Sequence, residues 1–121
     1  MAVEPTSMDS NVIETADDAL ALMRSVEMPN LKVMSDTIHV LYRKEIITDY
    51  VEKMGKDLVH VHISDVDRLP PGQATDFRLL VDALKNINYE GYLAMEIGLG
   101  GRGVDPNAFA RKAYEYMKPL L

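Results

Sequence analysis

The sequence predicts an α/β fold in which helices cover a parallel sheet, and three observations lead to this prediction. Short β-branched runs alternate with amphipathic stretches along the whole chain. The alternation repeats at intervals of about 30 residues, the length of a βαβ unit. No low-complexity segment or interdomain linker interrupts the 121 residues. The pattern therefore fits four β/α units of a (β/α)8 barrel, or a small doubly wound sheet.

The first unit begins with a short strand at residues 1–3. Thr15 is expected to cap the following helix, with Asp18 as its capping-box partner. The apolar residues at helical spacing behind this cap are Ala19, Leu20, Met23 and Val26. Residues 31–35 form the second strand, and Gly55 is the expected C-cap of the second helix. The inward face of that helix contains Ile46, Ile47, Tyr50, Val51 and Met54.

The third and fourth units follow the same pattern. Residues 58–63 are the clearest strand because they are β-branched and alternating. Thr75 or Asp76 is expected to cap the next helix, whose inward residues are Phe77, Leu80, Val81, Leu84 and Ile87. Residues 92–97 form the fourth strand. Asp105-Pro106 then opens a helix with a cap and an N1 proline in the favoured order, and its expected buried stripe is Phe109, Ala113, Tyr114 and Met117.

Composition excludes several classes of protein. A hydrophobic content of 47% with 26% charged residues is ordinary for a soluble globular domain. Apolar runs are too short to span a bilayer, and the N-terminus lacks the pattern of a signal peptide. The absence of cysteine is compatible with the cytoplasm, where we expect the protein to work. A net charge of −6 without a basic cluster disfavours nucleic acid as a partner.

Four polar residues stand where the expected strands give way to loops: Glu4, Asp36, His62 and Glu96. Ligands bind at the carboxyl ends of the strands in parallel β/α folds, so one candidate ligand comes from each successive strand. Three carboxylates and one imidazole suit Mn²⁺, Mg²⁺ or Co²⁺. The alternative is that each of the four is a solvated loop residue or a helix cap. From composition alone, the metal centre and this alternative have about equal weight.

Other polar residues near the strand ends have simpler interpretations. His60 shares a strand face with His62, and we expect it to be a hydrogen-bonded interior residue and not a ligand. Asp65 and Asp67 are expected to order their loop or to be solvated. The glycines at positions 98, 100, 101 and 103 are expected to make a flexible loop. A phosphate cradle there is the weaker interpretation, because no lysine pattern accompanies them.

Four segments carry a resemblance to a known family. They are Val3-Glu4-Pro5, Met34-Ser35-Asp36-Thr37-Ile38-His39, His60-Val61-His62-Ile63-Ser64-Asp65 with Arg68 and Pro71-Gly72, and Gly91-Tyr92-Leu93-Ala94-Met95-Glu96. Their order and spacing resemble the C-terminal half of the xylose isomerase-like TIM barrel superfamily. Within it, they are most similar to the sugar epimerases and isomerases of the D-tagatose 3-epimerase and hydroxypyruvate isomerase type. The resemblance implies a single half-barrel domain over residues 1–121, corresponding to strands five to eight of the barrel.

The resemblance also implies roles for particular residues. Glu4, Asp36, His62 and Glu96 would bind the metal ion, with Mn²⁺ favoured and Mg²⁺, Co²⁺ or Zn²⁺ as alternatives, and Glu4 and Glu96 would be the catalytic acid–base pair. His39 and Arg68 would hold substrate hydroxyl groups. The family has a second glutamate six residues after the first, where this sequence has Ser10 in a loop one residue short. Asp9 is expected to take its place in substrate binding.

The implied function is that of a metal-dependent sugar isomerase or epimerase. Such an enzyme moves a proton next to a ketose carbonyl through an enediolate, and its substrate is a sugar or sugar phosphate. A complete barrel takes about 250 residues, so we expect the chain to form a homo-oligomer or to need a missing N-terminal half. The alternative is a catalytically inactive half-barrel that acts as a binding or assembly module. Endonuclease IV-like chemistry is disfavoured because the chain has only 3 histidines.

Overall fold

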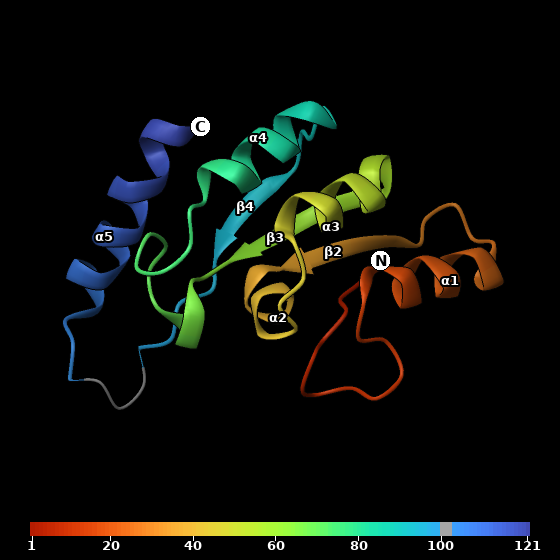
Figure 1. Ribbon diagram of the computed structural model, residues 1–121, viewed down its shortest axis with the longest axis horizontal. Helices are drawn as coiled ribbons and strands as arrows, with labels where there is room; N and C mark the ends of the chain where they lie inside the picture. Colours follow the sequence, from red (N-terminus) through yellow and green to blue (C-terminus); the bar gives the residue numbers. More distant parts are fainter. Residues whose placement is uncertain (100–102) are drawn as a thin grey trace.

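The computed structural model describes residues 1–99 and 103–121, which form an α/β fold around one parallel sheet (Figure 1). Its strands are β1 (Ala2–Val3), β2 (Lys32–Asp36), β3 (Leu58–Ile63) and β4 (Tyr92–Met95). They lie side by side in the order of the sequence, and every neighbouring pair is parallel. A doubly wound sheet reverses its strand order, whereas a barrel does not. The doubly wound alternative is therefore wrong, and the four units form half of a (β/α)8 barrel.

Five α-helices connect or follow the strands. They are α1 (Ala16–Val26), α2 (Thr37–Tyr42), α3 (Ile47–Met54), α4 (Arg78–Asn86) and α5 (Pro106–Met117). Three short 3₁₀ helices are η1 (Gly55–Asp57), η2 (Val66–Arg68) and η3 (Lys118–Leu120). In Figure 1 the helices α1, α3, α4 and α5 follow one another from right to left, in the same order as the units. Each unit thus places its helix beside that of the preceding unit.

The two faces of the sheet differ in burial. Val33, Val61 and Ile63 are fully buried in a core that they share with residues of the helices. On the opposite face, His60 and His62 are half-buried and Tyr92 is 83% exposed. The side chains of neighbouring strand residues point to opposite faces. The helices therefore cover one face, and the other face is the one that a complete barrel would enclose.

Local sequence signals confirm three of the predicted helix ends. Thr15 accepts a hydrogen bond from the Asp18 amide, and the Asp18 side chain accepts one from the Thr15 amide, so the capping box is present. Gly55 ends α3 with a positive φ of 51°, a conformation that glycine adopts at little cost. Asp105 caps α5 by accepting from the Asn107 amide.

Helix α2 was not predicted from the sequence. It has only six residues, three of which are β-branched, so its helical propensity is weak. Asp36 caps it by accepting a hydrogen bond from the Ile38 amide at 3.1 Å. A predicted metal ligand is therefore also the cap that starts this short helix.

Three other details differ from the sequence prediction. Helix α4 begins at Arg78 after Phe77, so the predicted cap position is wrong, although Asp76 still accepts a hydrogen bond from the Arg78 amide. Strand β4 ends at Met95, two residues earlier than predicted. Tyr114 is 58% exposed instead of buried. Tyr116, two residues later in α5, packs against the core instead, and its ring lies edge-to-face on that of Phe77.

The outer strands β1 and β4 are the two edges of the sheet over the described residues. Unpaired backbone groups at such edges favour pairing with further strands.

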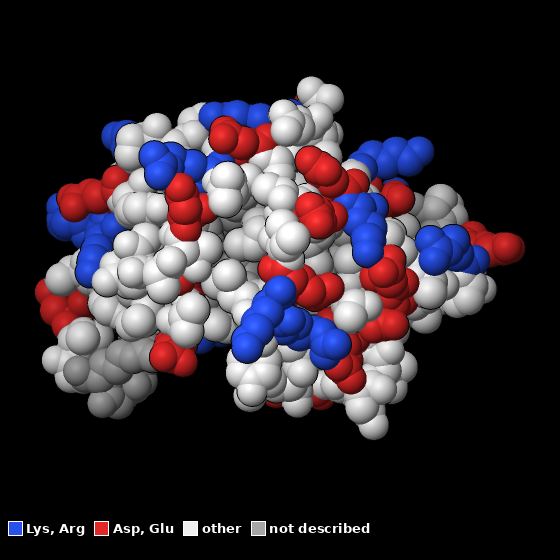
Figure 2. Space-filling model, viewed as in Figure 1, with Lys and Arg blue, Asp and Glu red and all other residues white. Residues whose placement is uncertain are grey.

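Acidic and basic side chains are interspersed over the face seen in Figure 2, without a continuous basic patch among the described residues of that face. Over the part of the chain that the structure describes, none of the helices is long and apolar enough to cross a membrane.

Candidate metal centre

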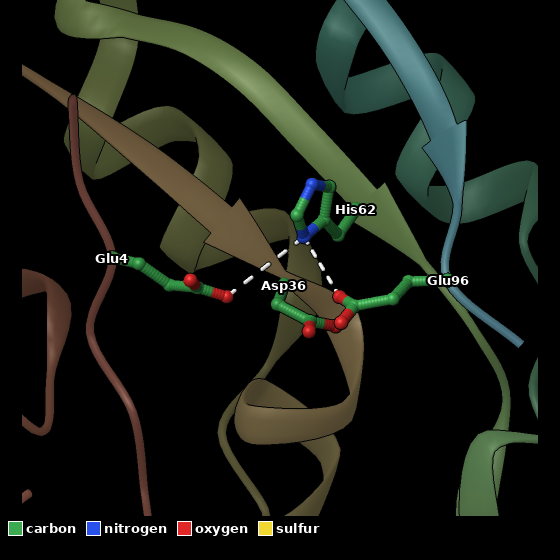
Figure 3. A group of neighbouring side chains, drawn as sticks. All are labelled: Glu4, Asp36, His62 and Glu96. Atoms are coloured by element: carbon green, nitrogen blue, oxygen red, sulfur yellow. Dashed lines mark ion pairs between the residues drawn. The ribbon is translucent and has the colours of Figure 1, made fainter. Parts of the chain in front are cut away.

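The four predicted ligands meet at one point beyond the strand ends (Figure 3). Glu4, Asp36, His62 and Glu96 each offer one nitrogen or oxygen atom, and these atoms all lie within 4.8 Å of one another. The separation is small enough for a single ion to contact all four. Figure 3 shows that Glu4 and Glu96 approach from opposite sides, with Asp36 and His62 between them.

Sheet register brings these side chains together. Asp36 at the end of β2 stands opposite His62 on β3, and His62 stands opposite Ala94 on β4. Glu96 lies two residues beyond Ala94, so it shares the same face of the sheet. Its amide donates to the Ile63 carbonyl at 2.9 Å, which continues the ladder past the end of β4. The convergence therefore follows from parallel pairing of strands whose polar residues are in phase.

The imidazole of His62 tests whether a cation fits this cluster. Its Nδ1 atom is buried and makes no hydrogen bond within the described residues. It nevertheless lies 2.7 Å from Oε2 of Glu96 and 3.9 Å from Oε1 of Glu4. A buried ring nitrogen without a hydrogen-bond partner is rare and costly. This nitrogen lies among carboxylate oxygen atoms, where its unprotonated form would be placed to bind a cation. The donor set of three carboxylates and one imidazole fits a divalent ion.

Burial and Arg68 set the charge state of the two adjacent carboxylates. Burial raises the pKa of Asp36, although the Ile38 amide and Arg68 oppose this shift. Burial also acts against ionisation of Glu96, but hydrogen bonding with Asp36 and the charges of Arg68 and His62 outweigh it and lower its pKa. Arg68 Nη1 lies 2.6 Å from Asp36 Oδ2 and 2.9 Å from Glu96 Oε2. The two carboxyl groups therefore behave as a pair whose pKa values are shifted in opposite directions.

The three predicted substrate residues lie in different surroundings. His39 is buried in α2, and its Nδ1 accepts a hydrogen bond from the Ser7 amide at 3.2 Å. Arg68 lies directly against the cluster, on η2. Asp9 is exposed in the loop between β1 and α1, outside the four-residue cluster. Ser10, at the position of the family's second glutamate, accepts hydrogen bonds from the Val12 and Ile13 amides and so shapes this loop.

The expectations for the neighbouring residues have mixed outcomes. His60 lies outside the cluster. Its ring lies edge-on to that of His62, with 4.9 Å between the ring centroids. It is half-buried, and the expectation of a hydrogen-bonded interior residue stays a prediction. Asp65 is fully buried and orders its loop, as predicted. Two glycines of the predicted flexible loop, at positions 100 and 101, lie outside the described residues.

Sequence reasoning missed two contacts that fix the site. Thr37 Oγ1 donates to the Ser64 carbonyl at 2.6 Å and accepts from the Ser64 amide at 2.9 Å. This pair joins the ends of β2 and β3 just beyond Asp36 and His62. The contact between Ser7 and His39 joins the first loop to α2. The only sequence signal for the first contact was a hydroxyl residue directly after a candidate ligand, which is too common to be used alone.

Comparison with known proteins gives the family. The family model for the xylose isomerase-like TIM barrel matches residues 1–120. Fructoselysine 3-epimerase of Escherichia coli O157:H7 is 30% identical over 128 residues, covering 100% of this chain and 46% of the relative. The structure of a 3-keto-D-glucoside 4-epimerase from E. coli matches with a TM-score of 0.88 and 26% identity, covering 98% of this chain and 45% of that one.

A third protein, L-ribulose 3-epimerase, has a TM-score of 0.90 at 22% identity, covering 99% of this chain and 46% of its own, and this likeness supports the fold alone. The chain thus spans less than half the length of the relative and of the two solved structures. Two of the three are 3-epimerases and one is a 4-epimerase, and each is named for a different sugar. Together with the sequential parallel strands and the strand-end cluster, these matches show that the chain belongs to the xylose isomerase-like TIM barrel family and forms the C-terminal half of its barrel.

Proposed function

We propose that this chain supplies the metal centre and the acid–base pair of a sugar epimerase or isomerase. The observation that carries the proposal is the meeting of Glu4, Asp36, His62 and Glu96 within 4.8 Å. The named relatives are sugar epimerases, which supports the same class of substrate here. A sugar or sugar phosphate with a ketose carbonyl is the expected ligand.

Glu4 and Glu96 are suited to move the proton. They come from the two outer strands and flank the central ligands from opposite sides (Figure 3). One carboxylate can remove the proton from one face of the carbon while the other returns it to the opposite face. A bound divalent ion, Mn²⁺ by preference, would supply the positive charge that stabilises the enediolate oxygen atoms. Removal and return of the proton on opposite faces would invert the configuration of the carbon atom. Transfer of the proton between adjacent carbon atoms would give isomerisation instead.

His39, Arg68 and Asp9 are the proposed contacts for substrate hydroxyl groups. Because Nδ1 of His39 accepts the Ser7 amide hydrogen, the neutral ring carries its proton on Nε2. That N–H is a donor suited to a sugar oxygen. Arg68 adds a charged donor beside the carboxylates. Asp9 lies in an exposed turn and would need the loop to move towards the centre.

Catalysis is proposed to require a completed barrel. Residues 1–121 are taken as one half-barrel domain, strands five to eight, whose edges β1 and β4 need four more strands. A second copy of the chain or a separate N-terminal half would supply them. The second candidate function is an inactive half-barrel that binds or assembles, and the observation that favours it is the pair of sheet edges, β1 and β4, over the described residues.

Two measurements test the proposal. Calorimetric titration with Mn²⁺ should give a saturable heat for the chain and a weaker one for Glu96→Gln, and equal heats would remove the ligand assignment. Deuterium incorporation from D₂O into a ketose should then be followed for the chain alone and for a fusion to the N-terminal half of the fructoselysine 3-epimerase. Exchange only in the fusion supports the enzyme, whereas metal binding without exchange in either protein supports the inactive module.

A further inference from the structure

Arg68 contacts two of the four carboxylate and imidazole groups in the cluster. Its Nη1 atom lies between Asp36 Oδ2, at 2.6 Å, and Glu96 Oε2, at 2.9 Å. The Asp36 side chain is 0% exposed, so this guanidinium is in contact with a fully desolvated carboxylate. Among the ion pairs of the described residues, the cluster carboxylates meet no other lysine or arginine.

The backbone that carries Arg68 is held in an unfavourable conformation. Asp67 and Arg68 have positive φ angles of 59° and 57°, which cost roughly 1 kcal/mol or more for each non-glycine residue. The buried carboxylate of Asp65 fixes the surrounding loops. It accepts hydrogen bonds from the amides of Val66, Gln73, Ala74 and Thr75 and from the Thr75 hydroxyl.

A second contact fixes the turn from the other side. The Arg68 carbonyl accepts a hydrogen bond from the Gly98 amide at 2.7 Å, two residues after Glu96. The position of Arg68 is thus tied to the same chain segment as the carboxylate that it contacts. Strained turns persist where the surrounding structure fixes them, and they gather at functional sites.

We propose that Arg68 is a built-in counter-cation of the acidic cluster, which holds Asp36 and Glu96 together when no metal ion is bound and weakens the binding of a divalent cation. Three carboxylates whose oxygen atoms lie within 4.8 Å would otherwise repel one another. The guanidinium competes with an ion for two of the three carboxylates. This role rests on the proposed metal centre and goes beyond a contact with substrate.

The sign of the effect follows from Coulomb's law. A unit positive charge in contact with two of the proposed ligands would disfavour the binding of a divalent ion there, even at high effective dielectric. Replacing Arg68 by a neutral residue should therefore tighten Mn²⁺ binding by about 10-fold. The same replacement should destabilise the metal-free fold because two adjacent carboxylates lose their partner. Opposite changes in these two quantities are not expected from a merely structural residue.

The experiment compares Arg68→Met, Arg68→Gln and Arg68→Lys in the full chain. Thermal unfolding in EDTA at low ionic strength should give a midpoint several degrees lower for the two neutral variants, and Arg68→Lys should lie near the parent. The decrease should shrink when Asp36→Asn is added, because the pair has already been broken. The Mn²⁺ dissociation constant, measured from the paramagnetic resonance signal of free Mn²⁺, should fall about 10-fold in the neutral variants.

Arg78→Met is the matched control, because Arg78 pairs with Asp76 at 2.7 Å on the exposed surface, away from the cluster. It should change neither quantity. An unchanged metal-free midpoint for both neutral variants, strict additivity with Asp36→Asn, or weaker Mn²⁺ binding would each overturn the proposal. If the parent chain binds no Mn²⁺, the metal centre fails, and the metal-free cycle between Arg68 and Asp36 still decides whether the pair acts as described.

Discussion

The two central ligands are held differently from the two outer ones. Asp36 and His62 extend from β2 and β3, strands that have a neighbour on both sides. Their side chains are 0% and 27% exposed. Glu4 and Glu96 follow β1 and β4, the edges of the sheet, and are 32% and 48% exposed. Each edge strand is also short, with two residues in β1 and four in β4.

The difference indicates which side chains this half-barrel holds in place by itself and which need neighbouring strands to hold them. Two hydrogen bonds between Thr37 and Ser64 tie the central strand ends together, and Asp65 accepts hydrogen bonds that order the loop after β3. The proposed acid–base pair lies at the edges, where the other strands of a complete barrel would pack. Metal binding should therefore depend mainly on the central pair, and catalysis mainly on completion of the barrel.

Replacing Asp65 by asparagine should give the largest effect, because it disturbs the buried anchor behind the central strand. Burial acts against ionisation of Asp65, but hydrogen bonds from Ala74, Thr75 and Val66 outweigh it and lower its pKa. Its contribution is therefore present above the ordinary aspartate pKa of about 3.9 and is lost as the pH falls through the lower folded-state value. Urea unfolding at pH 7 should show a loss of about 3 kcal/mol.

That loss should shrink as the pH is lowered below the ordinary aspartate pKa. The exposed carboxylate of Asp76 provides the control, since it also accepts amide and arginine hydrogen bonds. Asp76→Asn should change stability by less than about 0.5 kcal/mol. A pH-independent loss in Asp65→Asn would mean that the ionised carboxylate is not what stabilises the loop.

Asp36→Asn should have the largest effect on metal binding. Asparagine is as good an N-cap as aspartate, so α2 should keep its start while the central carboxylate charge is removed. The Mn²⁺ dissociation constant should rise at least 100-fold, about 2.7 kcal/mol. Calorimetric titration provides the measurement, and circular dichroism verifies the helix. A change below 10-fold would show that the central position is not favoured over the edges.

Thr37→Val should test the link between the two central strand ends. The variant keeps the shape of the side chain but leaves the buried amide and carbonyl of Ser64 without their partner. A loss of about 2 kcal/mol in unfolding free energy is expected. Thr37→Ser retains the hydroxyl group and should lose less than half as much. Equal losses would mean that the methyl group contributes as much to stability as the hydroxyl group that links the two strand ends.

Glu96→Gln should give the smallest effect of the series on metal binding. It removes charge from an edge ligand that is half exposed, so the Mn²⁺ dissociation constant should rise about 10-fold, or about 1.4 kcal/mol. In a completed barrel the edge would be buried, so the increase in the Mn²⁺ dissociation constant for Glu96→Gln should approach that for Asp36→Asn. A penalty that is the same in the half-barrel and the completed barrel would contradict the proposed dependence on neighbouring strands.

The sequence was enough to predict the alternating units, the parallel sheet and the meeting of four candidate ligands at the strand ends. These follow from local patterns: β-branched runs, helical spacing, and polar residues that come in phase once the strands pair in parallel. The capping box at Thr15 and Asp18 and the C-cap at Gly55 involve neighbours along the chain, so propensity is enough to predict them. The short helix α2 was missed because its start depends on one cap and its propensity is weak.

The way in which the site is held depends on contacts between segments that lie far apart in the sequence. Arg68 meets Asp36 across 32 positions of sequence, and Thr37 meets Ser64 across 27. The contact of Ser7 with His39 spans 32 positions. Such contacts depend on how successive units pack and on a turn with unfavourable φ angles, neither of which a periodic pattern encodes. Sequence periodicity places a residue at a strand end, whereas packing between units decides which side chain it meets there.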